Sequence, residues 1–376
     1  PPDMPHSWSY HNPVDVRFGG DAIATLAECI GTARYALVTY DEPYFAGLTG
    51  QLTKAAHAPA ITVNDVLPNP DCSNLKAQID RFWGLQGAMD LIVAIGGGSV
   101  IDTAKVLAAG RYGFDALMTQ VRAGVVSGDL SPPPLIAVPT TAGTGSEVTC
   151  WATIWDEAEG AKYSLAHVDF YPRTAVVDPA LMLGKSRELT RTTGLDALSH
   201  ALESIWNKNA NPVSARHAVF AARTILRDLP KLLSSPDDLP LRASMAEAAL
   251  SAGLAFSNTK TAIAHNISYP VTLRYGVAHG IACSFTLPTI LRSLPPLCGF
   301  RDTALDELFG QERNAGADQL AAALRGMGVG LSFKDYGVDR PEAEAIIEDA
   351  FLGQRGKNFI GTKYALFAAA QGDGLI

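Results

Sequence analysis

The sequence lacks the features that mark secreted and membrane-spanning proteins. Its five cysteines are odd in number, widely spaced and free of any CxxC pair, which is typical of reduced thiols rather than of a disulfide framework. No apolar run reaches the roughly 18 residues that a membrane span needs. The first residues, PPDMPHSWSY, do not have the basic-then-apolar order of a signal peptide. We therefore expect a cytoplasmic protein without a membrane partner.

Basic clusters are also missing, and the chain is too long for a single hydrophobic core. The formal net charge is −8, and no block of lysine and arginine could follow a phosphate backbone, so we expect no nucleic-acid partner. Single cores stop growing at roughly 250–300 residues, whereas this chain has 376. Because 47% of the residues are hydrophobic and 18% are charged, we expect a globular protein of two domains.

Two kinds of pattern divide the sequence near residues 180–190. Between residue 33 and about residue 178, short β-branched runs alternate with helical patterns, which is typical of βαβ units on a mostly parallel sheet. Strands are expected at 35–39, 61–63, 91–95, 135–138, 152–155, 163–166 and 175–177, and helices at 21–30, 74–86 and 99–109. Later segments, rich in alanine and leucine with apolar spacings of three to four residues, predict helices only. We expect an α/β domain over residues 1–185 and an all-α domain over residues 186–376.

A glycine-rich turn follows one of the expected strands. In DLIVAIGGGSVIDTAK (residues 90–105), an apolar strand runs into Gly96, Gly97 and Gly98 and then into a helix. Backbone N–H groups at a helix N-terminus attract anions, and glycine lets a phosphate approach them closely. The third glycine of the GxGxxG dinucleotide fingerprint is replaced by Ile101, so a plain tight turn is the competing interpretation.

A second loop, rich in hydroxyl groups and glycine, follows the strand expected at 135–138. The sequence PTTAGTGSE (residues 139–147) suits hydrogen bonds to phosphates, to a ribose or to a carboxamide. A polar surface loop is the alternative interpretation. Since open α/β sheets bind nucleotides at the carboxyl ends of their strands, two such loops together favour a nucleotide site.

Four residues of the second half carry the chemistry of metal ligands. Asp196 and His200 are four residues apart in GLDALSHALE, so one helix face presents both of them. His265 and His279 fall on two short helices that a Gly/Pro-bearing segment separates. Each residue alone is more often structural. One carboxylate and three imidazoles, with no suitably placed cysteine, together describe a Zn²⁺ or Fe²⁺ site.

The order of these motifs resembles that of the iron-containing (group III) alcohol dehydrogenase family. The resemblance covers about residues 13–290 and rests on GGGSVID, TTAGTGSE, GLDALSHALE, AFSN and the HG dipeptide that begins fourteen residues after His265. It implies an N-terminal α/β domain that binds a nicotinamide dinucleotide, NAD or NADP. It also implies a C-terminal helical domain that binds one divalent metal.

The resemblance assigns roles to individual residues. The metal pattern of the family falls on Asp196, His200, His265 and His279. Its cofactor-binding residues fall on Gly97, Gly98, Ser99, Asp102, Thr140, Thr141, Thr144 and Lys162, the last of which the family often places beside the cofactor ribose. Members that prefer NAD often have an acidic residue at the end of the first cofactor strand. Tyr40 occupies that place here and Asp41 follows it, so both cofactors stay open.

Two further departures from the family pattern lie near His265. Many members carry a second histidine close to the nicotinamide, at the place of Tyr269. A neutral phenol donates a hydrogen bond but moves protons less readily than imidazole at pH 7. Lys260 stands where the family usually has small or apolar residues. Either it is a solvated lysine at a helix start, or it forms a nest for a phosphonate or carboxylate with the hydroxyls of Thr259 and Thr261.

These observations predict a metal-dependent oxidoreductase that transfers hydride between a nicotinamide cofactor and a small aldehyde or primary alcohol. The candidate catalytic residues are His265, Tyr269 and Lys260. The segment ISYP (267–270) resembles the branch that reduces phosphonoacetaldehyde, which favours an anionic substrate. We also expect a homo-oligomer, with a dimer as the simplest form.

Two alternative functions stay open. One is a general short-chain alcohol dehydrogenase. The other is a metal- and NAD-dependent sugar-phosphate cyclase lyase, a class that shares this two-domain, dehydroquinate synthase-like plan. Such a lyase needs several cationic side chains near its metal to hold a phosphate and a carboxylate, whereas residues 257–288 contain only Lys260 and Arg274.

Overall fold

The computed structural model describes residues 7–128 and 130–376, which form two compact units. Residues 13–183 form an α/β unit, and residues 7–12 join residues 184–376 in a helical unit. None of the helices in the described ranges combines the length and the hydropathy that a bilayer crossing requires.

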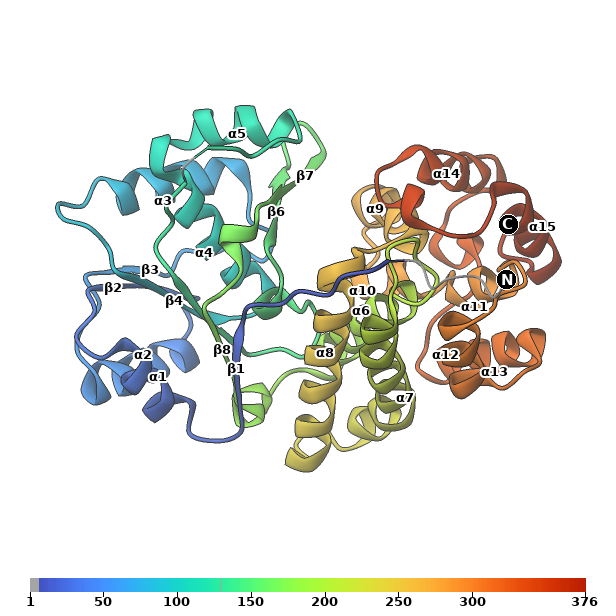
Figure 1. Cartoon of the computed structure of the whole chain (residues 1–376), viewed down its shortest axis with the longest axis horizontal. Helices are drawn as coiled ribbons and strands as arrows, with labels where there is room; N and C mark the ends of the chain where they lie inside the picture. Colours follow the sequence, from blue (N-terminus) through green and yellow to red (C-terminus); the bar gives the residue numbers. More distant parts are fainter. Residues whose placement is uncertain (1–6, 129) are drawn as a thin grey trace. The chain divides into compact units, whose positions relative to one another are not determined.

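Within the described residues, the α/β unit contains a sheet of six strands in the order β1-β8-β5-β4-β2-β3, and every neighbouring pair is parallel (Figure 1). The strands are β1 (Asp15–Phe18), β2 (Tyr35–Val38), β3 (Ile61–Val63), β4 (Leu91–Gly96), β5 (Leu135–Pro139) and β8 (Thr174–Val177). A separate antiparallel hairpin is made by β6 (Trp151–Asp156) and β7 (Ala161–Ala166). The chain runs outward from β2 to β3 and then returns to β4. The loops after β2 and β4 therefore diverge, which is the switch point where open α/β sheets bind nucleotides.

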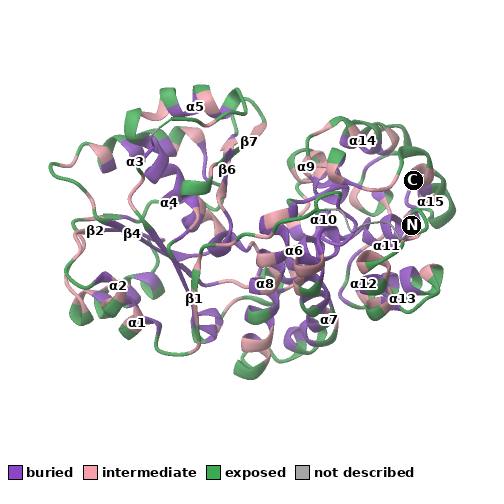
Figure 2. Ribbon diagram, viewed as in Figure 1, coloured by how far each residue is buried: buried purple, intermediate pink, exposed green. Residues whose placement is uncertain are grey.

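Helices cover both faces of this sheet (Figures 1 and 2). Successive residues of a strand point to opposite faces, so Leu37 packs with α1 and α2 whereas Val38 packs with α3, α4 and α5. The bounds of these helices are α1 (Ala22–Ile30), α2 (Pro43–Ala55), α3 (Cys72–Trp83), α4 (Gly98–Ala109) and α5 (Phe114–Arg122). Because both faces are covered, β2, β4 and β5 are buried along their whole lengths, as is usual for parallel strands.

The described part of the second unit is helical. Its α-helices are α6 (Arg187–Glu203), α7 (Pro212–Ser234), α8 (Leu239–Thr259), α9 (Ile263–Tyr275), α10 (His279–Ser284), α11 (Leu287–Arg292), α12 (Phe300–Phe309), α13 (Arg313–Gly326), α14 (Arg340–Leu352) and α15 (Lys363–Asp373). Helix α7 begins at a proline behind an Asn211 capping box, and Ser235 ends it. The helices α6 and α10, which carry three of the predicted metal ligands, are largely buried (Figure 2).

The predicted fold class is confirmed, with several local corrections. The expected strands are all present within two residues of their predicted ends, but β1, α2 and α5 were not predicted. Residues 7–12 do not join the α/β unit as expected. Instead, the Tyr10 hydroxyl donates to the carbonyl of Leu254, and the His11 N–H donates to the side chain of Asn258. Hydrogen bonds to α8 therefore bind this segment to the helical unit.

Candidate metal and nucleotide sites

Three helices bring the four predicted metal ligands together. Asp196 and His200 lie on α6, His265 on α9, and His279 at the start of α10. The Nε2 atoms of the three histidines lie 3.6, 3.5 and 3.7 Å from Oδ1 of Asp196, in chain order. All three imidazoles thus lie close to one carboxylate oxygen.

Within the described residues, two buried ligand atoms of this cluster lack hydrogen-bond partners, which fits a divalent cation. They are Oδ1 of Asp196 and Nε2 of His265. Burial would raise the pKa of Asp196, but the imidazoles of His200, His279 and His265 outweigh it and hold that pKa well below its usual range. Burial lowers the pKa of His200 to about 4. Burial lowers the pKa of His265, but Cys283, Glu203 and Asp196 outweigh it and raise that pKa well above its usual value. Because ionised carboxylates and neutral imidazoles are the forms that bind metal, a bound ion would displace the proton of His265.

Gly280 allows α10 to approach α6 closely. A Cβ atom at this position would lie 1.8 Å from the carbonyl oxygen of Thr192, so every other residue is excluded sterically unless the helices separate. The neighbouring His279 reaches Asp196 because of this contact.

The expectation that no cysteine lies near the ligands is wrong. Cys283 follows His279 by one helical turn on α10, and its Sγ lies 3.6 and 3.5 Å from Nδ1 and Nε2 of that histidine. One ligand atom from each of Asp196, His265, His279 and Cys283 can be chosen so that all four lie within 4.8 Å of one another. Burial raises the pKa of the Cys283 thiol. The donors assembled here are therefore one carboxylate, three imidazoles and one thiol.

Glu203 is a functional candidate that the sequence analysis did not single out. It is fully buried at the end of α6, and its Oε2 lies 2.6 Å from Nδ1 of His265. Its two carboxylate oxygens also accept the backbone N–H groups of Ala262 and Ala264 at 3.0 and 2.5 Å. Helix α9 has no cap from its own N-cap residue, so Glu203 caps it from another helix. The carboxylate directs Nε2 of His265 toward Asp196, as carboxylates do behind metal-binding histidines.

The predicted nucleotide residues gather at the switch point of the sheet. Strand β4 ends at Gly96, and Gly97 is the N-cap of α4, whose first turn has no side-chain cap. A Cβ at Gly97 would lie 3.5 Å from Thr141 and 3.6 Å from the Tyr40 hydroxyl, which places the loops after β2, β4 and β5 side by side. The open N–H groups of α4 fit the anionic diphosphate of a dinucleotide.

A buried network fixes the second loop against α4. Asp102 accepts the Ser146 hydroxyl at 2.6 Å and the Thr153 N–H at 2.8 Å, so both carboxylate oxygens bind protein groups. Lys105, which the sequence analysis passed over, is buried and donates to the Ser146 carbonyl, the Ser146 hydroxyl and the Trp151 carbonyl at 2.7–2.9 Å. These contacts indicate that Asp102 and Lys105 position the loop.

The other predicted cofactor residues lie on the same unit. Thr140 is buried and its N–H donates to the carbonyl of Gly96, and the Ser99 hydroxyl donates to the carbonyl of Pro68. Asp41 is exposed beyond β2 and accepts from Asn64 at 3.2 Å. Lys162 lies on β7, with its ammonium 5.0 Å from the ring centre of Trp155.

Replacing Gly98 by alanine tests the contact between the two loops. The added methyl group would lie 2.6–3.0 Å from side-chain atoms of Thr144. We expect a loss of about 1–3 kcal/mol in the free energy of unfolding, measured with urea, and about tenfold weaker NADH binding, measured by fluorescence titration. Adding Thr144→Ser removes the nearest of these atoms, Cγ2, and is expected to restore part of the stability. Unchanged stability and affinity in Gly98→Ala would contradict this geometry.

Comparisons with known proteins identify two family models that match this chain. Residues 13–179 match the model of the family "iron-containing alcohol dehydrogenase", and residues 190–364 match that of the "Fe-containing alcohol dehydrogenase family, C-terminal". The NAD-dependent methanol dehydrogenase of Bacillus methanolicus is 32% identical over 348 residues, which cover 88% of each chain. The chain belongs to the iron-containing alcohol dehydrogenase family. It is therefore an oxidoreductase of a family that acts on alcohols and aldehydes.

Two relatives with charged substrates in their names are also similar. The phosphonoacetaldehyde reductase of Streptomyces viridochromogenes is 37% identical over 259 residues, which cover 66% of this chain and 65% of the relative. The crystal structure of sulfoacetaldehyde reductase from Bifidobacterium kashiwanohense in complex with NAD⁺ superposes with a TM-score of 0.87 at 29% identity, covering 98% of this chain and 99% of that one.

Tyr269 and Lys260, which depart from the family pattern, lie in different environments. The Tyr269 ring is parallel to that of His279 with centroids 6.3 Å apart, its hydroxyl is buried, and burial raises its pKa. Lys260 is exposed and caps the C-terminal end of α8 with φ 62°, so the expectation that it begins a helix is wrong. The hydroxyls expected beside it are engaged: Thr259 bonds Ser204 and Thr261 accepts from Arg355.

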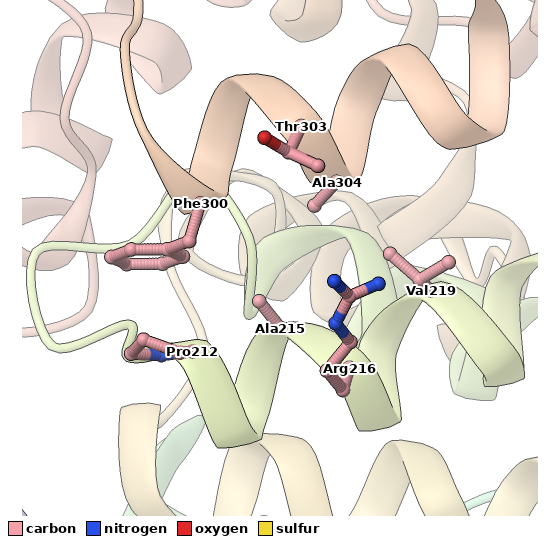
Figure 3. Close-up of a pocket in the computed structure, with 7 residues that line it drawn as sticks. All are labelled: Pro212, Ala215, Arg216, Val219, Phe300, Thr303 and Ala304. Carbon is pink, nitrogen blue, oxygen red and sulfur yellow. The ribbon is translucent and has the colours of Figure 1, made fainter.

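A surface hollow of about 120 Å³ lies elsewhere on the helical unit, between α7 and α12 (Figure 3). Its lining consists of Pro212, Ala215, Arg216, Val219, Phe300, Thr303 and Ala304. The predicted ligands and cofactor residues are not among these side chains.

Proposed function

We propose that the protein reduces a small aldehyde bearing an anionic group, using a nicotinamide cofactor and one divalent metal. The observation that carries the proposal is the cluster of Asp196 with the imidazoles of His200, His265 and His279, whose Nε2 atoms lie 3.5–3.7 Å from one carboxylate oxygen. Fe²⁺ and Zn²⁺ both suit these ligands. The metal supplies Lewis-acid polarisation of the carbonyl group, and the nicotinamide supplies the hydride.

The chain's own residues prepare this chemistry. Glu203 holds Nδ1 of His265, so Nε2 of that ring is presented to the metal. Tyr269 stays protonated because burial raises its pKa, and we propose that its hydroxyl hydrogen-bonds the reacting oxygen. Gly97, Gly98 and the N–H groups at the start of α4 bind the cofactor diphosphate, with Thr140, Thr141 and Thr144 beside them.

The cofactor is NADH or NADPH, and we favour NADH. Asp41 follows β2, where a carboxylate binds a ribose 2′-hydroxyl and repels a 2′-phosphate. The NAD⁺ in the structure of the sulfoacetaldehyde reductase supports this choice. Lys162 is proposed beside the ribose.

The anionic substrate class is supported by two relatives whose names specify two-carbon aldehydes with a phosphonate or a sulfonate. A neutral short-chain alcohol is the second candidate, because the methanol dehydrogenase and a 1,3-propanediol dehydrogenase of Klebsiella pneumoniae are 32% and 30% identical. Membership of an alcohol dehydrogenase family disfavours the lyase alternative. We also propose a homodimer, and the molar mass measured by light scattering tests this.

The function is tested by following NADH and NADPH oxidation with phosphonoacetaldehyde, sulfoacetaldehyde and propanal. The protein is loaded anaerobically with Fe²⁺ or Zn²⁺. We expect net oxidation of one reduced cofactor per aldehyde, and a kcat/KM at least about tenfold higher for an anionic aldehyde than for propanal. A preference for propanal would reject the anionic substrate class. The absence of net cofactor oxidation with every aldehyde would reject the reductase itself.

A further inference from the structure

An arginine from a distant part of the sequence lies beside the metal cluster. Arg355 follows α14, directly before the turn η6 (Gly356–Asn358). Its Nη1 donates to the Thr261 hydroxyl at 2.7 Å, and its guanidinium carbon lies 5.5 Å from the ring centre of Tyr269. Since the same Tyr269 ring is stacked on His279, one aromatic ring separates the guanidinium from a predicted metal ligand.

Close backbone packing fixes the turn that carries Arg355. A Cβ at Gly353 would lie 2.0 Å from the Asn266 side chain on α9, and one at Gly356 would lie 1.8 Å from the carbonyl oxygen of Ala350. Asn266 in turn donates to that carbonyl at 2.8 Å, and the Asn358 side chain donates to the carbonyl of Thr261 at 2.9 Å. The turn is therefore built on α9, the helix of His265.

Arg355 has no acidic partner among the described residues. Across residues 7–128 and 130–376, no carboxylate lies within 4.0 Å of its guanidinium, whereas Arg292 near the end of α11 pairs with two aspartates. Within the described part of the chain, one of its hydrogen-bonding groups is used, by the neutral hydroxyl of Thr261, and the side chain is half-buried. A half-buried cation with spare donors and no acidic partner favours binding of an anion.

We propose that Arg355 binds the anionic group of the substrate and so determines its class. The inference rests on the proposed reduction of an anionic aldehyde. A planar guanidinium bonds two oxygens of a phosphonate, sulfonate or carboxylate at once. Arg355 and His279 both lie beside the ring of Tyr269, which brings the guanidinium into the surroundings of the metal cluster. Arg355 thereby takes the role that the sequence predicted for Lys260.

Steady-state kinetics of Arg355→Gln with phosphonoacetaldehyde and with propanal test this role. We expect KM for phosphonoacetaldehyde to rise about 10- to 100-fold with kcat changed less than about threefold, because a charge-assisted pair is lost from substrate binding. The kinetic constants for propanal should stay within about threefold. Arg355→Lys keeps the charge without the two-point geometry and should recover part of the affinity.

Two lysines serve as comparisons. Lys357 is exposed in the same turn, so Lys357→Ala removes an equal charge and is expected to leave both substrates unaffected. Lys260→Ala tests the competing cation. A selective loss of affinity for phosphonoacetaldehyde in Lys260→Ala, together with normal KM in Arg355→Gln, would overturn the inference.

The outcomes separate this inference from the proposed function. Failure of the unmodified protein to prefer either phosphonoacetaldehyde or sulfoacetaldehyde over propanal refutes the proposed substrate class. A second outcome is a clear preference of the unmodified protein for phosphonoacetaldehyde, together with an equal fall in kcat/KM for both aldehydes in Arg355→Gln. That result refutes only the role of Arg355. Loss of the hydrogen bond from Arg355 to Thr261 can also disturb the structure. Urea unfolding and the metal content of each variant detect such a disturbance. If Arg355→Gln does not fold, Arg355→Lys decides, since a rise in KM restricted to the anionic aldehyde supports the role and equal changes reject it.

Discussion

Replacing His265 by alanine is expected to remove the bound metal and to lower kcat/KM for aldehyde reduction by about 10³-fold or more. His265 is buried, and its Nε2 lies 3.5 Å from Oδ1 of Asp196. Removing the imidazole leaves a buried carboxylate with one donor fewer around the proposed ion. The polarisation that a metal provides contributes several kcal/mol to stabilising the transition state, and each 1.4 kcal/mol corresponds to about tenfold in rate. Metal content by mass spectrometry and turnover with NADH are the measurements.

Two further variants distinguish loss of the metal from misfolding of the protein. His279→Ala changes a ligand whose side chain is 33% exposed, so its removal disturbs the core less and should still release the metal. His217 is half-buried and stacks on Tyr10 with centroids 5.9 Å apart, and His217→Ala should keep metal and activity. Full metal stoichiometry and normal turnover in both ligand variants would refute the proposed metal site.

Replacing Glu203 is expected to weaken metal binding, because its carboxylate orients the predicted metal ligand His265. Glu203→Gln removes the negative charge beside His265 and should lower the metal affinity about 10- to 100-fold, as for other carboxylates behind metal-binding histidines. Glu203→Ala also leaves the N–H groups of Ala262 and Ala264 and Nδ1 of His265 without their acceptor. We expect it to cost about 3–5 kcal/mol in the free energy of unfolding.

Chelator competition gives the metal affinity of these variants, and urea unfolding gives their stability. Glu188 provides the matched comparison, because it is an exposed carboxylate on the same helix that pairs only at the surface with Arg191. Glu188→Gln should change neither quantity appreciably. Equal metal affinity in Glu203→Gln and the unmodified protein would show that the carboxylate has no role in orienting His265.

Local patterns predicted the parts of the site that lie on one element. Asp196 and His200 share a helical spacing, and the glycine turn after β4 follows directly from an apolar strand. The signal for Cys283 was also present, since it follows His279 by one turn, but its value as a donor was overlooked. Glu203 belongs to the same motif as His200. Its position among alanine and leucine residues indicates a buried carboxylate, which needs hydrogen-bond partners.

Other features depend on contacts between distant segments and have no local signature. Arg355 is 86 residues beyond Tyr269, and its place follows from the packing of Gly353 and Gly356. Lys260 looked like part of a helix start, whereas α8 extends to Thr259. Helix α2 escaped prediction because Gly47 and Gly50 interrupt its apolar pattern.

The capping of α9 by Glu203 has a consequence for how the protein exchanges its metal. The hydrogen bonds that hold the first turn of this helix join protein groups only. Backbone contact at Gly280 likewise brings His279 close to α6. Contacts between the helices therefore help to hold His265 and His279 in place, and we expect an ion to exchange without unfolding of these helices. Because its ligands suit both iron and zinc, the metal content of the protein should follow the supply of each ion in its surroundings.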